Sequence, residues 1–142
     1  MQKLFIIITT ISFSFLTGCI QQNTTNYKNN FNSISTEEFV NLKQSGKYQI
    51  IDIRNKHELQ NTGHIPKAKK IEYYSKEFLE ILKNLDKDKK YLIYCNTGNR
   101  TSHTLDIMEN MGFEKAFHLK GGIQEWMKEE NDLINCSTSY IC

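Results

Sequence analysis

The chain has 142 residues, of which 24 % are charged and 39 % hydrophobic, and its formal net charge is only +2 at pH 7. This length suits one compact domain. The near balance of charge argues against a nucleic-acid partner, because nucleic acids select strongly basic surfaces. The short lysine clusters at 67–70 and 87–90 are typical of solvated turns.

The first residues resemble a bacterial lipoprotein leader. Lys3 precedes an apolar stretch at 4–16, which is shorter than the roughly 20 residues that span a bilayer. The stretch ends in LTGC, and in such precursors the cysteine, here Cys19, is acylated. We therefore expect residues 1–18 to be a signal peptide with a lipobox. The protein would then be an extracytoplasmic, membrane-anchored lipoprotein, on the periplasmic side of the inner or outer membrane or at the cell surface; an ordinary secretory leader is the alternative.

Beyond the leader, the composition predicts a tether, one domain and a tail. Residues 19–30 are polar and carry too few apolar side chains to form a core. From 31 to 130 apolar runs alternate with amphipathic stretches, over a length of about 100 residues that suits one domain. Residues 131–142 are expected to be a polar tail, in which Cys136 and Cys142 could form a disulfide outside the cytoplasm.

The predicted elements of the domain alternate between helices and strands. Ser35-Thr36-Glu37-Glu38 has the pattern of a capping box and predicts a helix that stops at Gly46. Hydrophobic periodicity then predicts strands at 48–53, 68–73, 91–94 and 116–119, and helices at 55–60, 78–85, from the loop after 95 to 112, and from 121 onward. This alternation predicts an α/β domain with a parallel sheet, whose ligands bind beyond the carboxyl ends of the strands.

The loop after the strand at 91–94 carries the main chemical candidate. It has the sequence CNTGNR, from Cys95 to Arg100, and joins a strand to a helix. Backbone N–H groups of a tight loop and of a helix's first turn bind anions, and with a nearby cation they lower the pKa of a thiol from its usual value of about 8.5. Gly98 allows the loop to curl, and Arg100 offers a planar fork for an oxyanion. We predict a nucleophilic thiolate at Cys95; a buried core cysteine is the alternative.

Other polar residues give weaker patterns. Asp52 and Arg54 follow the strand at 48–53, so they are expected near Cys95 at the same edge of the sheet. The histidines lack the paired spacing of metal ligands and are predicted to be surface or packing residues, so no metal site is expected. They are His57, His64, His103 and His118.

Several motifs, in this order and spacing, resemble the rhodanese-like sulfurtransferase family. They are Asp52-Ile53-Arg54, GHIP at 63–66 with Ala68, the loop CNTGNR, and LKGG at 119–122 followed by Trp126. The resemblance covers 31–130. It implies a three-layer α/β/α domain around a five-stranded parallel sheet, with a short edge strand near 32–34.

The resemblance also implies an activity and roles for individual residues. Cys95 corresponds to the family's nucleophile, and Arg100 to an arginine that binds the substrate anion. Asp52 and Arg54 resemble a structural ion pair beside the loop, or simply order the end of the strand. The anion cradle would be formed by backbone N–H groups of the residues after Cys95: Asn96, Thr97, Gly98, Asn99, Arg100 and Thr101.

The implied reaction is that of a thiosulfate sulfurtransferase. Cys95 would take sulfane sulfur from thiosulfate or a related small anionic donor as a persulfide, and pass it to a thiol or cyanide-like acceptor or to an unidentified partner protein, without a metal or organic cofactor. A persulfide-carrying or sulfide-sensing binding module is the first alternative. A phosphatase or arsenate reductase is the second, although its loop has five residues between cysteine and arginine and this chain has only four, Asn96 to Asn99.

Overall fold

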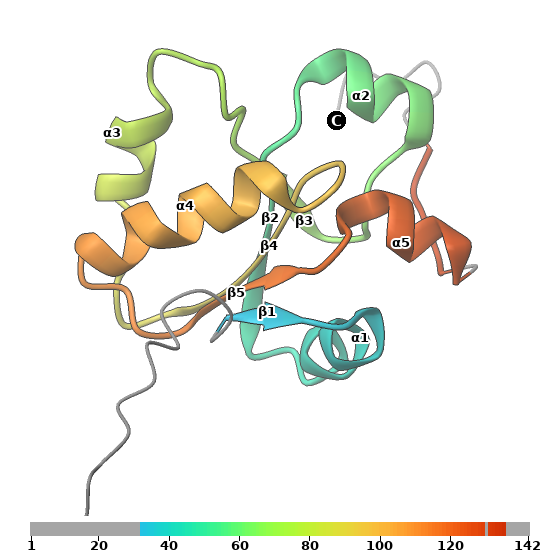
Figure 1. Ribbon diagram of the computed structural model, residues 1–142, viewed down its shortest axis with the longest axis horizontal. Helices are drawn as coiled ribbons and strands as arrows, with labels where there is room; N and C mark the ends of the chain where they lie inside the picture. Colours follow the sequence, from blue (N-terminus) through green and yellow to red (C-terminus); the bar gives the residue numbers. More distant parts are fainter. Residues whose placement is uncertain (1–31, 130, 136–142) are drawn as a thin grey trace, which may run out of the picture.

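The computed structural model describes residues 32–129 and 131–135 (Figure 1). The predicted leader, Cys19, the whole tether at 19–30, and the predicted pair Cys136 and Cys142 lie outside the described residues. Within the described ranges, no helix is long and apolar enough to cross a membrane.

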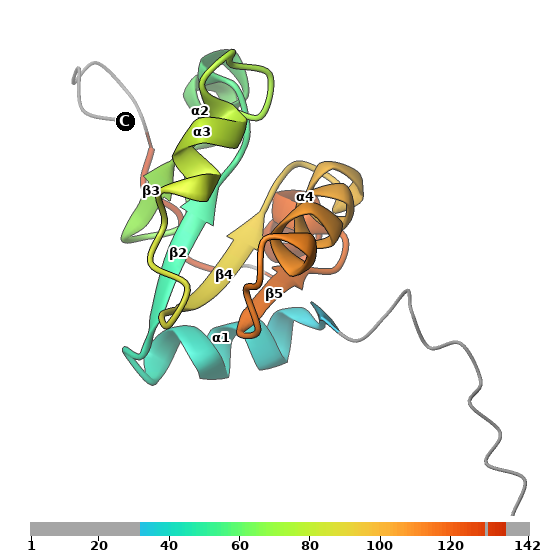
Figure 2. The ribbon, with the colours of Figure 1, turned by 90° about the vertical axis from the view of Figure 1, so that its left-hand side faces the viewer.

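Five parallel strands form one sheet in the order β1-β5-β4-β2-β3. The pairing of β2 with β4 aligns Asp52 with Tyr94, so the loops after both strands leave the sheet at the same edge, as Figure 2 shows. The predicted five-stranded parallel α/β fold is confirmed. The strands are β1 (Ser33–Ile34), β2 (Tyr48–Asp52), β3 (Ala68–Lys70), β4 (Lys90–Tyr94) and β5 (Ala116–Leu119).

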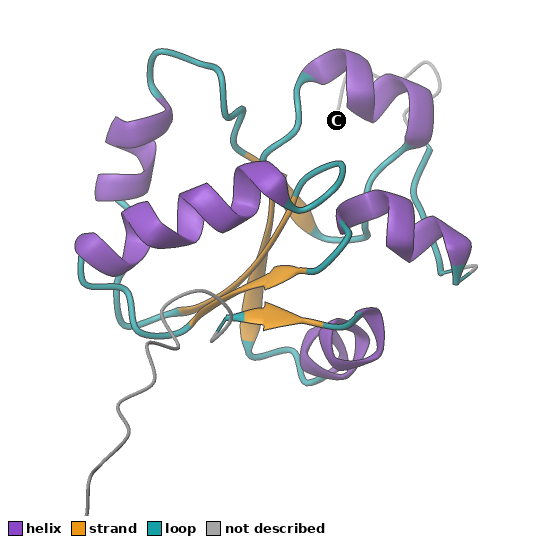
Figure 3. Cartoon of the chain, in the orientation of Figure 1, coloured by secondary structure: helices purple, strands orange, loops and turns teal. Residues whose placement is uncertain are grey.

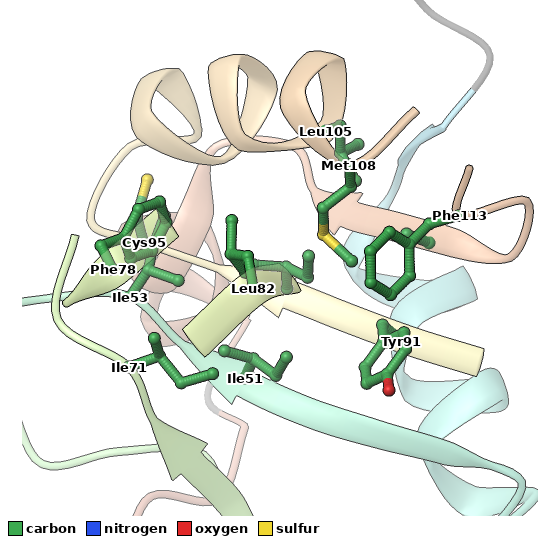
Figure 4. Close-up of a cluster of buried hydrophobic side chains, with 12 residues drawn as sticks. Ile51, Ile53, Ile71, Phe78, Leu82, Tyr91, Cys95, Leu105, Met108 and Phe113 are labelled. Atoms are coloured by element: carbon green, nitrogen blue, oxygen red, sulfur yellow. The ribbon is translucent and has the colours of Figure 1, made fainter. Parts of the chain in front are cut away.

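Helices lie on both sides of the strands (Figure 3). Successive residues of β4 pack on opposite faces, because side chains alternate along a strand. Ile93 belongs to the core that contains Leu82 of α3 and Met108 of α4, and Leu92 belongs to the core that contains Phe39 of α1 and Trp126 of α5. Figure 4 shows the first of these cores, with Leu82 and Met108 labelled. The helices are α1 (Thr36–Gln44), α2 (Lys56–Thr62), α3 (Phe78–Lys83), α4 (Asn99–Asn110) and α5 (Gly122–Lys128).

Several elements differ in length from the prediction, and β3 and α2 show why. β3 stops at Lys70, although residues 71–73 were expected in the strand; it is an edge strand that pairs only with β2. α2 runs to Thr62, because the Thr62 hydroxyl donates to the Glu58 carbonyl and Gly63, with φ +72°, ends the helix. A full capping box is present at Asn55 and Glu58 of α2, where the sequence analysis did not place one.

The packed part of the chain continues past residue 130, where the sequence analysis placed the end of the domain. The Trp126 indole donates to the Asp132 carbonyl at 3.1 Å. Ile134 forms an antiparallel bridge with His64, and Leu133 packs against the core that contains Trp126. Contacts with the domain therefore extend past the predicted boundary, through two apolar residues in a segment whose composition is otherwise polar.

Candidate active site

Cys95 follows β4 directly and is completely buried, with 0 % of its surface exposed. Its sulfur points toward α4 (Figure 4). The Gly98 N–H donates to Sγ at 3.2 Å, and the Thr101 hydroxyl lies 3.7 Å from Sγ. Gly98 caps α4 with φ +94°, a conformation that favours glycine, and this conformation lets the loop curl around the sulfur.

The first turn of α5 holds the cysteine loop from the other side. The Ile123 N–H donates to the Cys95 carbonyl at 2.8 Å, and the Gln124 N–H donates to the Asn96 carbonyl at 3.2 Å. A Cβ on Gly122 would stand 2.5 Å from both carbonyl oxygens. This close approach requires glycine and fixes the backbone on either side of the nucleophile candidate.

Arg100 forms a two-point ion pair with Glu58 of α2. Its Nη2 and Nη1 donate to Oε1 and Oε2 of Glu58 at 2.6 Å and 2.9 Å, and its guanidinium lies 5.8 Å from the centre of the Tyr74 ring. The hydrogen bonds from Arg100 hold the pKa of Glu58 below its usual value. The hydrogen bonds to Glu58, together with the charges of Glu58 and of a Cys95 thiolate, raise the pKa of Arg100 against its burial. A negative charge on the Cys95 sulfur thus favours the charged form of Arg100.

Asp52 and Arg54 form an ion pair in which both side chains are at most 1 % exposed. Arg54 also donates to the Gly63 carbonyl at 2.7 Å and to the Thr62 hydroxyl at 2.7 Å. Burial lowers the pKa of Arg54, but the hydrogen bonds to Asp52 and the Asp52 charge outweigh burial and raise it overall. The pair ties the end of β2 to the turn after α2, and within the described residues it forms no hydrogen bond with Cys95.

A buried histidine completes the surroundings of the sulfur. His118 of β5 is 8 % exposed, and its Nδ1 lies 2.9 Å from the Thr101 hydroxyl. Burial lowers the pKa of His118. His118 is therefore one of the packing histidines that the sequence predicts, buried against Thr101. Its position was readable from the pattern, because a strand residue between Phe117 and Leu119 faces the same side of the sheet as Ala116.

The predicted site residues are only partly brought together. Cys95, Gly98 and Thr101 contact one another, whereas Thr97 and Asn99 are exposed. The roles of Asn96, Thr97, Asn99 and Arg100 toward a substrate stay predictions. The described residues hold no group of three or more His, Cys, Asp or Glu side chains that could bind a metal ion.

The fold and the loop define a class of parallel α/β proteins that hold a cysteine in a loop of N–H donors beyond the end of a strand. The family model described as Rhodanese-like domain matches residues 35–129. The chain belongs to this family.

Two relatives match this chain over part of their own length. The "tRNA uridine(34) hydroxylase" of Sodalis glossinidius is 31 % identical over 105 residues, which are 70 % of this chain and 29 % of that protein. The "Probable adenylyltransferase/sulfurtransferase MoeZ" of Mycobacterium tuberculosis is 34 % identical over 98 residues, 68 % of this chain and 25 % of that protein. The chain therefore spans less than a third of either relative.

One solved structure is matched over nearly all of its own length. The rhodanese-like domain protein from Staphylococcus aureus has a TM-score of 0.61 and 30 % identity, and the match covers 73 % of this chain and 99 % of that one. The described domain therefore accounts for nearly the whole of that solved chain.

Proposed function

We propose that the protein is a sulfurtransferase that carries sulfane sulfur as a persulfide on Cys95. The observation that supports this most directly is the Gly98 N–H, which donates to Sγ at 3.2 Å inside a loop that opens a helix. Such donors stabilise a thiolate before the reaction and a persulfide anion after it. Membership in the rhodanese-like family, and a relative named as a probable sulfurtransferase, agree with this chemistry.

The first step is a displacement on sulfur. The Cys95 thiolate attacks the outer sulfur of thiosulfate and forms a new S–S bond. The bond between the two sulfur atoms of the donor breaks, and its electron pair leaves with sulfite. One negative charge stays on the Cys95 persulfide, and two leave with sulfite, so no oxidant or reductant is needed.

The second step returns the thiolate. A thiolate or cyanide acceptor attacks the outer sulfur of the persulfide, the S–S bond to Cys95 breaks, and its electron pair returns to Sγ. The product is an acceptor persulfide or thiocyanate. We propose that Arg100 donates hydrogen bonds to the sulfonate oxygens of the donor. The donor would compete with Glu58, which accepts hydrogen bonds from Nη1 and Nη2 of Arg100 in the structure.

Turnover by the purified chain tests this proposal. With thiosulfate and cyanide, the unaltered chain is expected to form thiocyanate, and Cys95→Ser is expected to form none. Ser102→Ala, at an exposed position of α4, is the matched control and should keep full turnover. Turnover that survives in Cys95→Ser contradicts the proposal. Loading without turnover identifies a persulfide carrier in place of an enzyme.

We also propose that Cys19 is acylated and anchors the domain to a membrane outside the cytoplasm. The support is the leader pattern alone: Lys3, the apolar stretch at 4–16 and the LTGC tetrapeptide. Cells that make the full chain with a clickable fatty acid should label it, and Cys19→Ala should lose the label. An unlabelled chain, or a label that survives in Cys19→Ala, contradicts acylation at this position.

A further inference from the structure

We propose that His118 is a positioning residue that acts through the Thr101 hydroxyl to stabilise the anionic sulfur of Cys95. This inference deepens the proposed function and rests on it for its significance, since an anionic sulfur is what a persulfide mechanism requires. The distances are 2.9 Å from Nδ1 of His118 to the Thr101 hydroxyl and 3.7 Å from that hydroxyl to Sγ.

The sheet places the three residues together. β4 and β5 are parallel neighbours in which Ile93 aligns with His118, so His118 lies one strand away from the sulfur and two residues before it. Ala116, Ile93 and Cys95 belong to the core under α4, and alternation places His118 on that same face. Thr101, in the first turn of α4, is completely buried above it.

The hydroxyl of Thr101 has one proton and several neighbours that can accept it. The hydroxyl donates to the Gly98 carbonyl at 2.9 Å, and Nδ1 of His118 lies at the same distance from the hydroxyl oxygen. If Nδ1 carries no proton, it can accept the Thr101 proton, which then points away from the sulfur. If Nδ1 carries a proton, it donates to the Thr101 oxygen, and the hydroxyl proton is directed to Sγ or to the Gly98 carbonyl.

With Nδ1 protonated, His118 no longer competes for the Thr101 proton. In this proposal the hydroxyl then turns from the Gly98 carbonyl, 2.9 Å away, toward a thiolate at Sγ, 3.7 Å away, and becomes its second donor besides the Gly98 N–H. The Nδ1-protonated form needs no imidazolium, which agrees with the burial that lowers the pKa of His118. As the sulfur becomes a persulfide, the same donor can remain directed at it. No proton leaves the site, so the role of His118 is to orient Thr101 rather than to act as a base.

Other charged groups near the sulfur do not replace this contact. Arg100, in the first turn of α4, interacts with the Cys95 charge but is paired with Glu58 of α2. Asp52 and Arg54, at or just after the end of β2, are paired with each other. No charged partner of His118 is found among the described residues, and burial is the one cause of its pKa shift. A change in the pH profile of Cys95 on substitution of His118 therefore reports the route through Thr101.

The experiment follows alkylation of Cys95 by iodoacetamide against pH in the full chain, read from the mass of the Cys95 peptide. His118→Phe keeps a ring but removes the donor, and Thr101→Val removes the hydroxyl. Both variants should alkylate roughly three- to tenfold more slowly at acidic pH, with the midpoint moved upward. His118→Asn and Thr101→Ser keep the polar groups and should stay within about twofold of the unaltered chain.

The double variant Thr101→Val/His118→Phe should be no slower than Thr101→Val alone, because His118 acts through Thr101. An unchanged pH profile in His118→Phe, or an effect that multiplies in the double variant, overturns the proposal. Nitrogen chemical shifts of His118 in the unaltered chain give a test that needs no variant: protonation at Nε2 alone also overturns it. If these results hold but thiosulfate loads no sulfur, the proposed function fails and the role of His118 stands.

Discussion

Gly122 lies so close to Cys95 that a Cβ on it would stand 2.5 Å from the Cys95 carbonyl oxygen. Its φ of +64° is also unfavourable for any residue with a side chain. The glycine at the start of α5 is therefore part of what positions the cysteine loop, although it touches the loop only through its backbone.

Replacing Gly122 by Ala should destabilise the domain by roughly 3 kcal/mol or more, because a steric clash adds to backbone strain. Gly46→Ala is the matched control: Gly46 has φ +68° and nothing within 4 Å of a Cβ, so it tests strain alone, at a cost of about 1 kcal/mol. Urea unfolding measures both. Equal losses in the two variants would show that the close approach to Cys95 costs nothing.

The ion pair between Glu58 and Arg100 should make stability depend on pH. The pKa of Glu58 is lowered in the folded state, so its contribution is complete above its usual value of 4.5 and is lost as the pH falls through the lower folded value. Glu58→Gln should therefore cost about 1 kcal/mol at pH 7, and progressively less below pH 4.5.

The control for this measurement is Glu80→Gln, whose exposed partner Lys83 lies 3.8 Å away. It should change the free energy of unfolding very little at any pH. The assignment of Glu58 is wrong if both variants give the same flat difference between pH 7 and pH 4.

Removing one partner of the buried pair of Asp52 and Arg54 should lower the free energy of unfolding more than replacing both partners with apolar residues. Asp52→Ala leaves a guanidinium with 0 % exposure without its carboxylate, at a cost of about 3–5 kcal/mol. The double variant Asp52→Leu/Arg54→Met removes both charges and should lose less stability than the single variant. Chemical denaturation compares the two; a double variant that is less stable than Asp52→Ala would contradict this account of the pair.

The segment at 131–135 should contribute to stability. A chain that stops at residue 129 lacks the carbonyl that binds the Trp126 indole and the pairing of Ile134 with His64. Its free energy of unfolding should be about 2 kcal/mol lower than that of a chain that stops at residue 135. Equal stabilities would place the end of the domain at residue 130.

The sequence predicted the sheet and the place of Cys95, because apolar periodicity and the strand-to-helix loop are local patterns. It did not predict that Glu58 binds Arg100, since these two residues are 42 positions apart and are brought together only by the order of the strands. The contact of His118 with Thr101 needs the register of β4 and β5, which no single segment specifies. The parts missed are thus long-range contacts between polar side chains.

The central claim is that Cys95 accepts sulfur, and the mass of the Cys95 peptide after treatment with thiosulfate tests it most directly. The account predicts a gain of one sulfur atom on that peptide, removed by cyanide with the release of thiocyanate. It predicts no gain at that position in Cys95→Ser. A Cys95 peptide of unchanged mass, in a chain that is folded and exposed to excess thiosulfate, would contradict the claim for this donor and for the chemistry proposed here.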